Sequence, residues 1–181
     1  MRTSAPPTAE KTPMNRSVLA LTLVLLTSVT VDARAQRKGP ALGAPGAPLT
    51  VSARIDDKNY GATGPGSCRH APTASIHGIP AALWLIEYDN RSSAGIKRLN
   101  LTLWRPTDGS SDQVSLSLST SSTTHRINSV GKPQSEGAAT VKISPLATGG
   151  RLELKGNDAG GATIELTVVC PAFVGVEAEG G

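Results

Sequence analysis

The stretch GPGSCRHAPTASIHGIPAALWLIEYD, residues 64–89, decides how this chain folds. It contains one of the two cysteines, two of the three histidines and one of the two tryptophans of the 181-residue sequence. Residues of these types mark either a reactive site or the anchor of a fold. We interpret the stretch as an anchor, because its cysteine has one possible partner in the chain, Cys170.

The N-terminal residues indicate export. An apolar run at 17–31 follows Arg16 and precedes Ala33-Arg34-Ala35, which predicts a signal peptide cleaved after Ala35 within an N-terminal extension, residues 1–35. The run is shorter than the roughly 20 residues of a membrane span, although an uncleaved anchor remains the alternative. A leader rich in Gly, Pro and Ala follows at 36–48 and is expected to be flexible. We predict a secreted or periplasmic protein without a stable membrane span after cleavage.

Charge gives no support to a nucleic-acid partner. Cleavage after Ala35 removes four of the 18 basic and two of the 14 acidic residues, which leaves a net charge of +2. The mature chain has no basic run and no basic residues interleaved with aromatic ones. We therefore expect no binding of nucleic acid.

The two cysteines predict one disulfide. An exported protein with a small, even number of cysteines usually pairs them. A Cys68–Cys170 bridge would close a loop of 102 residues, and chain entropy assigns about 4.7 kcal/mol to a loop near 100 residues. Two free thiols are the alternative, which an oxidising compartment disfavours.

The rest of the chain alternates apolar and polar residues with a period of two, the pattern of half-buried strands. The segments with this pattern are 49–55, 83–88, 98–103, 114–119, 141–143, 152–154 and 162–168. Turn clusters rich in Gly, Asp, Asn and Ser separate them. The pattern predicts an all-β domain at 49–173, a single antiparallel β-sandwich or flattened barrel, and a flexible tail at 174–181.

The stretch around residues 64–89 agrees with an all-β fold. GATGPGS, residues 61–67, is too rich in glycine for a strand, TASIHG at 73–78 predicts a short strand, and AALWLIEYD at 81–89 predicts the most apolar strand. Cys170 continues the inward phase of Ile164, Leu166 and Val168. We therefore expect the bridge inside the core, with Trp84 packed near it.

Two segments carry a resemblance to a known family. VSARIDDKNYGATGPGSC at 51–68 and ATIELTVVC at 162–170 resemble the mycobacterial 19 kDa lipoprotein-antigen family, as does the order of signal segment, leader and two distant cysteines. The resemblance implies an envelope-exposed sandwich without an active site. It does not imply acylation, because no cysteine directly follows the apolar run.

His70, His77 and His125 are the candidate metal ligands, since exported β-sandwiches can hold copper or zinc through imidazoles. The chain has no His-x-His and no H-E-x-x-H, and its mature part lacks methionine. The alternative interpretation places these histidines on the surface or in loops. A metal-binding exported protein is therefore the second candidate function, and we expect no cofactor.

Catalytic patterns are weak. The sequence has no G-x-S-x-G elbow, and Ser115, Ser117 and Ser119 alternate along one strand as its wet face. Asp56 and Asp57 are adjacent, so they point apart on an extended chain, and a solvated turn explains them better than a calcium loop. We predict that the protein is not an enzyme, with an exported hydrolase as the remaining alternative.

Trp104, Arg105 and Tyr60 are the candidate binding surface. Trp104 breaks the alternation after Leu103, and an exposed indole can stack on a sugar or anchor a protein partner. The alternative is a ring folded over the sheet edge. The sequence thus predicts an exported, non-catalytic binding or structural module whose partner is a protein or carbohydrate of the envelope.

Overall fold

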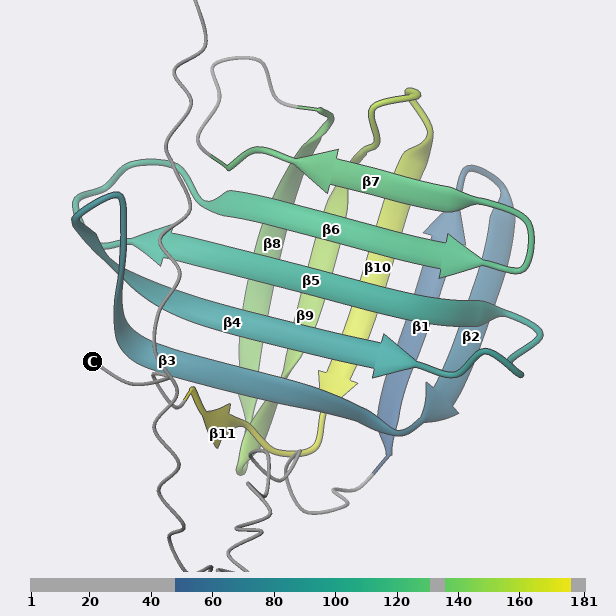
Figure 1. Cartoon of the computed structure of the whole chain (residues 1–181), viewed down its shortest axis with the longest axis horizontal. Helices are drawn as coiled ribbons and strands as arrows, with labels where there is room; N and C mark the ends of the chain where they lie inside the picture. Colours follow the sequence, from purple (N-terminus) through teal and green to yellow (C-terminus); the bar gives the residue numbers. More distant parts are fainter. Residues whose placement is uncertain (1–47, 131–135, 177–181) are drawn as a thin grey trace, which may run out of the picture. The chain divides into compact units, whose positions relative to one another are not determined.

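The computed structural model describes residues 48–130 and 136–176, which form eleven strands and no helix (Figure 1). The strands lie in two sheets packed face to face, so the predicted all-β sandwich is confirmed. The predicted signal peptide at 1–35 and all but Pro48 of the leader at 36–48 lie outside the described residues. Nothing in the described part of the chain is a helix long and apolar enough to cross a membrane.

One sheet has five strands in the order β2-β1-β10-β9-β8. Their bounds are Lys58–Gly64 (β2), Leu49–Ile55 (β1), Thr163–Cys170 (β10), Gly149–Asn157 (β9) and Ala138–Leu146 (β8). The other sheet has six strands in the order β11-β3-β4-β5-β6-β7. Their bounds are Val174–Gly175 (β11), Gly66–Ile76 (β3), Ile79–Asp89 (β4), Ile96–Pro106 (β5), Gln113–Thr120 (β6) and Thr124–Asn128 (β7).

The strands of the two sheets cross at a steep angle, as Figure 1 shows. Sandwiches of this orthogonal kind turn their corners with strands that pass from one sheet to the other. Here the chain leaves the five-stranded sheet at the end of β2 and enters the six-stranded sheet at the start of β3, with Pro65 between them. A second corner joins β7 to the segment before β8 through the bridge between Asn128 and Glu136.

The core lies between the sheets and is almost entirely aliphatic. Along β1, Leu49, Val51, Ala53 and Ile55 are buried and the residues between them are exposed. The same alternation buries three leucines of β5 and three apolar residues of β10. Each fully buried Leu, Ile or Val side chain contributes roughly 1.5–3 kcal/mol, so this repeated pattern is what holds the sheets together.

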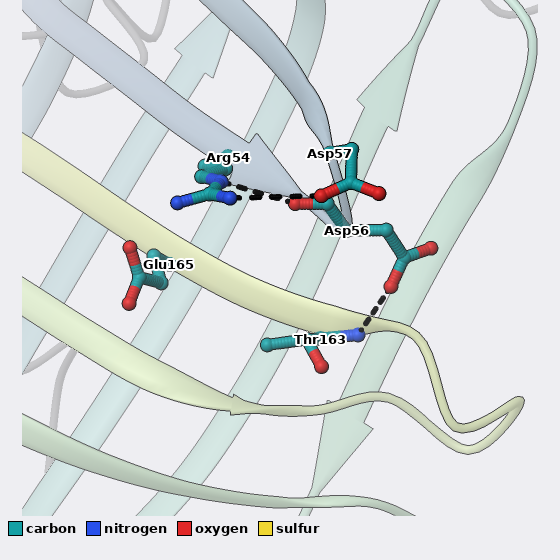
Figure 2. A pocket seen from close by; sticks show the side chains of 5 residues that line it. All are labelled: Arg54, Asp56, Asp57, Thr163 and Glu165. Atoms are coloured by element: carbon teal, nitrogen blue, oxygen red, sulfur yellow. Dashed lines mark hydrogen bonds and ion pairs between the residues drawn. The ribbon is translucent and has the colours of Figure 1, made fainter.

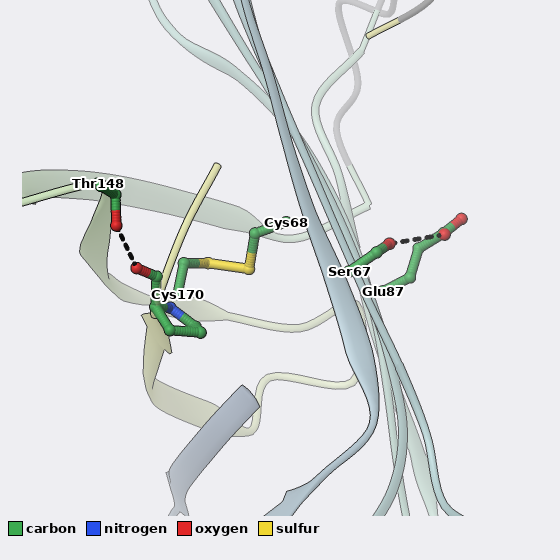
Figure 3. The surroundings of a disulfide bond; sticks show 6 residues. Ser67, Cys68, Glu87, Thr148 and Cys170 are labelled. Carbon is green, nitrogen blue, oxygen red and sulfur yellow. Dashed lines mark hydrogen bonds between the residues drawn. A yellow bond between two sulfur atoms is a disulfide. The ribbon is translucent and has the colours of Figure 1, made fainter. Parts of the chain in front are cut away.

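The predicted bridge between Cys68 and Cys170 is present (Figure 3). Cys68 lies on β3 and Cys170 on β10, and their Cα atoms are 6.0 Å apart. Both belong to the buried core, in which Cys170 has no exposed surface. The bridge therefore ties one sheet to the other through the core, as the inward phase of Cys170 predicts.

The glycine-rich segment at 61–67 is not the loop that its composition predicts. Its first four residues end β2 and its last two begin β3. A Cβ atom on Gly66 would lie 2.6 Å from the carbonyl oxygen of Glu87 and 2.8 Å from a methyl group of Leu49. Glycine stands here because the backbone passes close to its neighbours at the corner between the sheets.

The turn between β3 and β4 consists of His77 and Gly78. Both have positive φ, 51° and 80°, as a tight two-residue hairpin turn requires. The short strand predicted at 73–78 is therefore the end of the much longer β3, and His77 is exposed at the tip of the hairpin. Its backbone conformation fits the turn even though histidine rarely adopts it.

The C-terminal boundary also differs from the prediction. Val174 and Gly175, placed in a flexible tail, form β11, which pairs in parallel with Arg69 and His70 of β3. The sandwich thus extends two residues past 173 and is antiparallel except for this short pair. Phe173 orients the segment, because its N–H donates to the carbonyl of Thr148, 2.9 Å away.

Candidate functional site

An open hollow lies at the end of β1, on the outer face of the five-stranded sheet. Arg54, Asp56, Asp57, Thr163 and Glu165 line it (Figure 2). The Asp56 carboxylate accepts the N–H of Thr163 at 2.9 Å, and Arg54 Nε donates to the Asp56 carbonyl at 3.1 Å. Asp56 has a φ of 49°. These bonds close a turn, which is the solvated turn expected from the sequence.

Glu165 is the carboxylate on the strand side of this hollow. A hydrogen bond from Lys155 Nζ at 3.0 Å, the charge of that ammonium and the charge of Arg54 hold the pKa of Glu165 below its ordinary value. A general acid needs the opposite, a carboxyl whose pKa is raised toward neutrality. Glu165 therefore lacks the raised pKa of a general acid, and it forms an ion pair with Lys155.

The three histidines lie apart in the structure. His70 is in the middle of β3, His77 is at the β3–β4 turn, and His125 is on the edge strand β7. Among residues 48–130 and 136–176, no three His, Cys, Asp or Glu side chains are grouped to hold a metal ion. The structure thus does not bring together the metal ligands that the sequence suggested.

His125 instead pairs with Asp158, in the turn between β9 and β10 of the other sheet. Its Nδ1 lies 2.7 Å from Asp158 Oδ2, and the side chains are 13% and 11% exposed. Asp158 also accepts the N–H groups of Gly160 and Ala162, both at 2.9 Å. Burial raises the pKa of Asp158, but the bonds from His125 and from these N–H groups, with the charge of His125, outweigh burial and lower the pKa overall.

His70 belongs to an inter-sheet cluster that consists of His70, Trp84, Arg105, Asp112 and Phe173. Its ring stacks on Trp84 with centroids 4.4 Å apart, and its Nδ1 is 2.9 Å from the Leu83 carbonyl oxygen. Phe173 lies against the same imidazole, with centroids 5.8 Å apart. The histidine is therefore a packed member of the sandwich, and Trp84 is in the core as predicted.

Arg105 completes the inter-sheet cluster. Its guanidinium lies 5.6 Å from the centre of the Trp84 ring and binds both carboxylate oxygens of Asp112, at 2.7–3.2 Å. It also donates to the Val141 carbonyl on β8, 3.0 Å away in the other sheet. The hydrogen bond to Asp112, opposed by burial and aided by the charge of Asp112, raises the pKa of Arg105. Arg105 therefore joins the two sheets.

Trp104, Arg105 and Tyr60 do not form one surface. Trp104 and Arg105 are neighbours on β5, so their side chains point to opposite faces of the sheet. Trp104 lies half-buried on the outer face, whereas Tyr60 packs against the core from β2. The three residues share no face because strand geometry separates adjacent residues and the fold places β2 in the other sheet.

Sequence reasoning missed Asp112, Asp158 and Phe173. For Asp158 a signal existed, because the turn cluster GNDAGG places an aspartate two residues before a glycine, the spacing of an Asx turn. For Asp112 and Phe173 no local signal exists. Their partners, Arg105 and His70, are set by which strands meet.

Comparison with known proteins finds no match among models of protein families, curated proteins or solved structures. Any proposal about the function therefore depends on the structure of this chain. In the described part of the chain, that structure offers two outer sheet faces, open hollows with charged residues on the five-stranded sheet, and polar side-chain contacts that bridge the sheets.

Proposed function

We propose that this protein is an exported β-sandwich module of the cell envelope or the secreted fraction, which binds a partner or builds structure and does not catalyse a reaction. The observation that carries the proposal is the disulfide between Cys68 and Cys170, buried between the sheets. Disulfides of this kind form and persist in oxidising compartments. They support small domains that work outside the cytosol.

The polar groups inside the domain support a scaffold rather than a reaction centre. The Asp158 carboxylate is engaged by His125 and by two backbone N–H groups, and the Arg105 guanidinium is engaged by Asp112 and Val141. Catalytic groups need a free partner and a pKa shifted toward neutrality. These groups have the opposite features, because each one closes a contact between the sheets.

Export and the bridge can be tested together. The full chain, produced in a bacterial host with a C-terminal tag, is fractionated, and its intact mass is measured with and without reductant. We expect a mature chain that starts at Gln36, found outside the cytoplasm and lighter than the reduced chain by two hydrogen atoms. A variant with Ala33→Asp and Ala35→Asp is the control, because it should block cleavage after the apolar run.

Two outcomes would contradict the proposal. The first is a full-length cytoplasmic chain whose two cysteines both react with an alkylating agent before reduction. The second is covalent labelling of the mature protein by a serine-reactive probe, abolished by prior unfolding, which would establish an exported hydrolase.

A further inference from the structure

The two outer faces of the sandwich differ in how their charged residues are distributed. The face of the five-stranded sheet carries a network of charged side chains with ion pairs Arg151–Glu153, Lys155–Glu165 and Arg54–Asp57. The face of the six-stranded sheet also carries ion pairs, Arg69–Glu87 and Arg98–Asp89, but its neighbouring strands β5 and β6 have uncharged outward residues from Asn100 to Trp104 and from Gln113 to Ser117. A partner that binds through charge would use the first face, and a neutral partner would use the second.

The neutral plate is the surface made by three cross-strand pairs on the outer face of β5 and β6. These pairs are Trp104 with Gln113, Thr102 with Ser115, and Asn100 with Ser117. The alternate residues of β5, Leu99, Leu101 and Leu103, are buried in the core, which places the plate on the solvent side. From Trp104 to Asn100 the strand rises about 13 Å, a length that spans more than one sugar ring.

The polar groups of the plate are not used within the fold. Asn100, Thr102, Ser115 and Ser117 form no side-chain hydrogen bond with another described residue, whereas the hydroxyls at the rim do, as in the bond between Ser119 and Thr124. Gln113, opposite Trp104, has a buried Oε1 that no described residue contacts through a hydrogen bond. The donors and acceptors of these four exposed or half-buried side chains are available to a ligand, whereas the covered Gln113 Oε1 is not.

Charges border the plate and are mostly neutralised. Arg69 binds Glu87 at 3.0 Å on one side, and Arg98 binds Asp89 at 2.9 Å at the far end. Arg126 on β7, next to Ser117, is exposed and has no ion pair among the described residues. The plate therefore has an indole at one end, hydroxyl and amide groups in the middle, and little net charge.

We propose that the neutral plate binds an uncharged oligosaccharide lying along β5 and β6. This inference rests on the proposed function, because it names the class of ligand that the proposed binding module would take. A pyranose has an apolar face that stacks on an indole, and hydroxyl groups that both donate and accept hydrogen bonds. Trp104 supplies the first contact, and the Thr102, Ser115, Asn100 and Ser117 side chains supply the second.

The proposal is tested by titration of the mature protein with uncharged hexasaccharides: cellohexaose, chitohexaose and maltohexaose. Binding is followed by calorimetry and by tryptophan fluorescence. We expect at least one of the three to bind with saturation. Trp84→Phe leaves Trp104 as the single tryptophan, and its emission should change on binding.

Matched variants locate the site. Trp104→Ala should weaken binding about tenfold or more, and Asn100→Ala with Ser117→Ala should weaken it severalfold. Lys142→Ala, on the outer face of the other sheet, and Arg126→Ala, at the border of the plate, should leave affinity unchanged. Circular dichroism confirms that each variant is folded, so a loss of binding reports the contact.

Four results would overturn the proposal. The first two are the absence of saturable binding of any hexasaccharide, and equal binding by the wild-type and Trp104→Ala proteins. The third is binding of an acidic polysaccharide alone, lost on Arg126→Ala. The fourth is protection of Trp104 from quenching by acrylamide that ends when residues 36–47 are removed, or that accompanies a dimer in sedimentation. Each leaves export and the disulfide intact, so failure here is distinct from failure of the proposed function.

Discussion

At the scale of single residues, two buried polar groups distinguish this domain from an ordinary aliphatic sandwich. Asp158 has more partners than any other carboxylate of the core region, because it accepts from His125 and from two backbone N–H groups. The Tyr88 hydroxyl is the opposite case, since it is buried and has no hydrogen-bond partner within residues 48–130 and 136–176. Removing the Asp158 carboxylate should therefore lower the free energy of unfolding, and removing the Tyr88 hydroxyl should raise it.

Asp158→Asn should lower the free energy of unfolding by about 1.5 kcal/mol at pH 7, the value of a hydrogen bond to a charged group. Because the folded-state pKa of Asp158 lies below its ordinary value of 3.8, its stabilisation is present above that value and is lost as pH falls through the folded-state pKa. Urea unfolding at pH 7 and at pH 3 measures the difference in the free energy of unfolding between the wild-type and Asp158→Asn proteins, which should be smaller at pH 3. Asp57→Asn, at a side chain that is 99% exposed, is the control; a deficit of equal size at both pH values would contradict the prediction.

Tyr88→Phe should raise the free energy of unfolding by about 1 kcal/mol. The hydroxyl has lost its water and gained no partner, so its removal relieves a desolvation cost and leaves the ring packing unchanged. Urea unfolding measures the difference, with Tyr60→Phe on the edge strand as the comparison. A loss of stability on Tyr88→Phe would show that the hydroxyl has a partner.

At the scale of elements, the passage from β2 to β3 matters most, because there the chain changes sheets. Gly66 lies between the Glu87 carbonyl and the Leu49 side chain, with no room for a Cβ atom. Gly61, five residues earlier on β2, has nothing within 4 Å of such an atom. The two glycines therefore have different roles although they belong to the same sequence run.

Gly66→Ala should lower the free energy of unfolding by about 2 kcal/mol, because the methyl group displaces backbone at the corner. Gly61→Ala should change it by less than about 0.5 kcal/mol or raise it slightly, since alanine restricts the unfolded chain. Thermal and urea unfolding of the two variants provide the comparison. If both variants are equally stable, the corner is not as tightly packed as the structure shows.

At the scale of the whole molecule, three covalent or polar side-chain contacts among the described residues join the two sheets in addition to the aliphatic core. They are the Cys68–Cys170 bridge, the His125–Asp158 pair and the bond from Arg105 to the Val141 carbonyl. The bridge spans 102 residues, far more than the other two contacts. It should therefore contribute the largest single term to the stability of this domain.

The double variant Cys68→Ala with Cys170→Ala should lose about 3–5 kcal/mol, since the unfolded chain regains the entropy of a long loop. Equilibrium urea unfolding measures the loss, and the wild-type protein unfolded and refolded in reductant should behave like the variant. Arg105→Lys serves as a comparison for a single polar contact between the sheets. A loss below about 1 kcal/mol in the double variant would show that the core alone holds the sheets together.

Much of this fold could be predicted from the sequence, because period-two alternation and an even cysteine count are local or compositional signals. Leu49–Ile55 and Thr163–Cys170 show the alternation most clearly, and both are strands in the structure. Lys58–Gly64 and Thr124–Asn128 could not be predicted in this way. The first is rich in glycine, and the second is too short to show a period.

The sequence by itself determined that the chain is built of strands, that Cys170 points inward and that Cys68 is its partner, since side-chain alternation and thiol chemistry act within a segment or leave one choice. Only the tertiary structure decided which sheet each strand joins, that His125 meets Asp158, and that Arg105 meets the Val141 carbonyl. The reason is that these pairings join residues far apart in the chain. Their free energy depends on how two sheets cross, which no local pattern records.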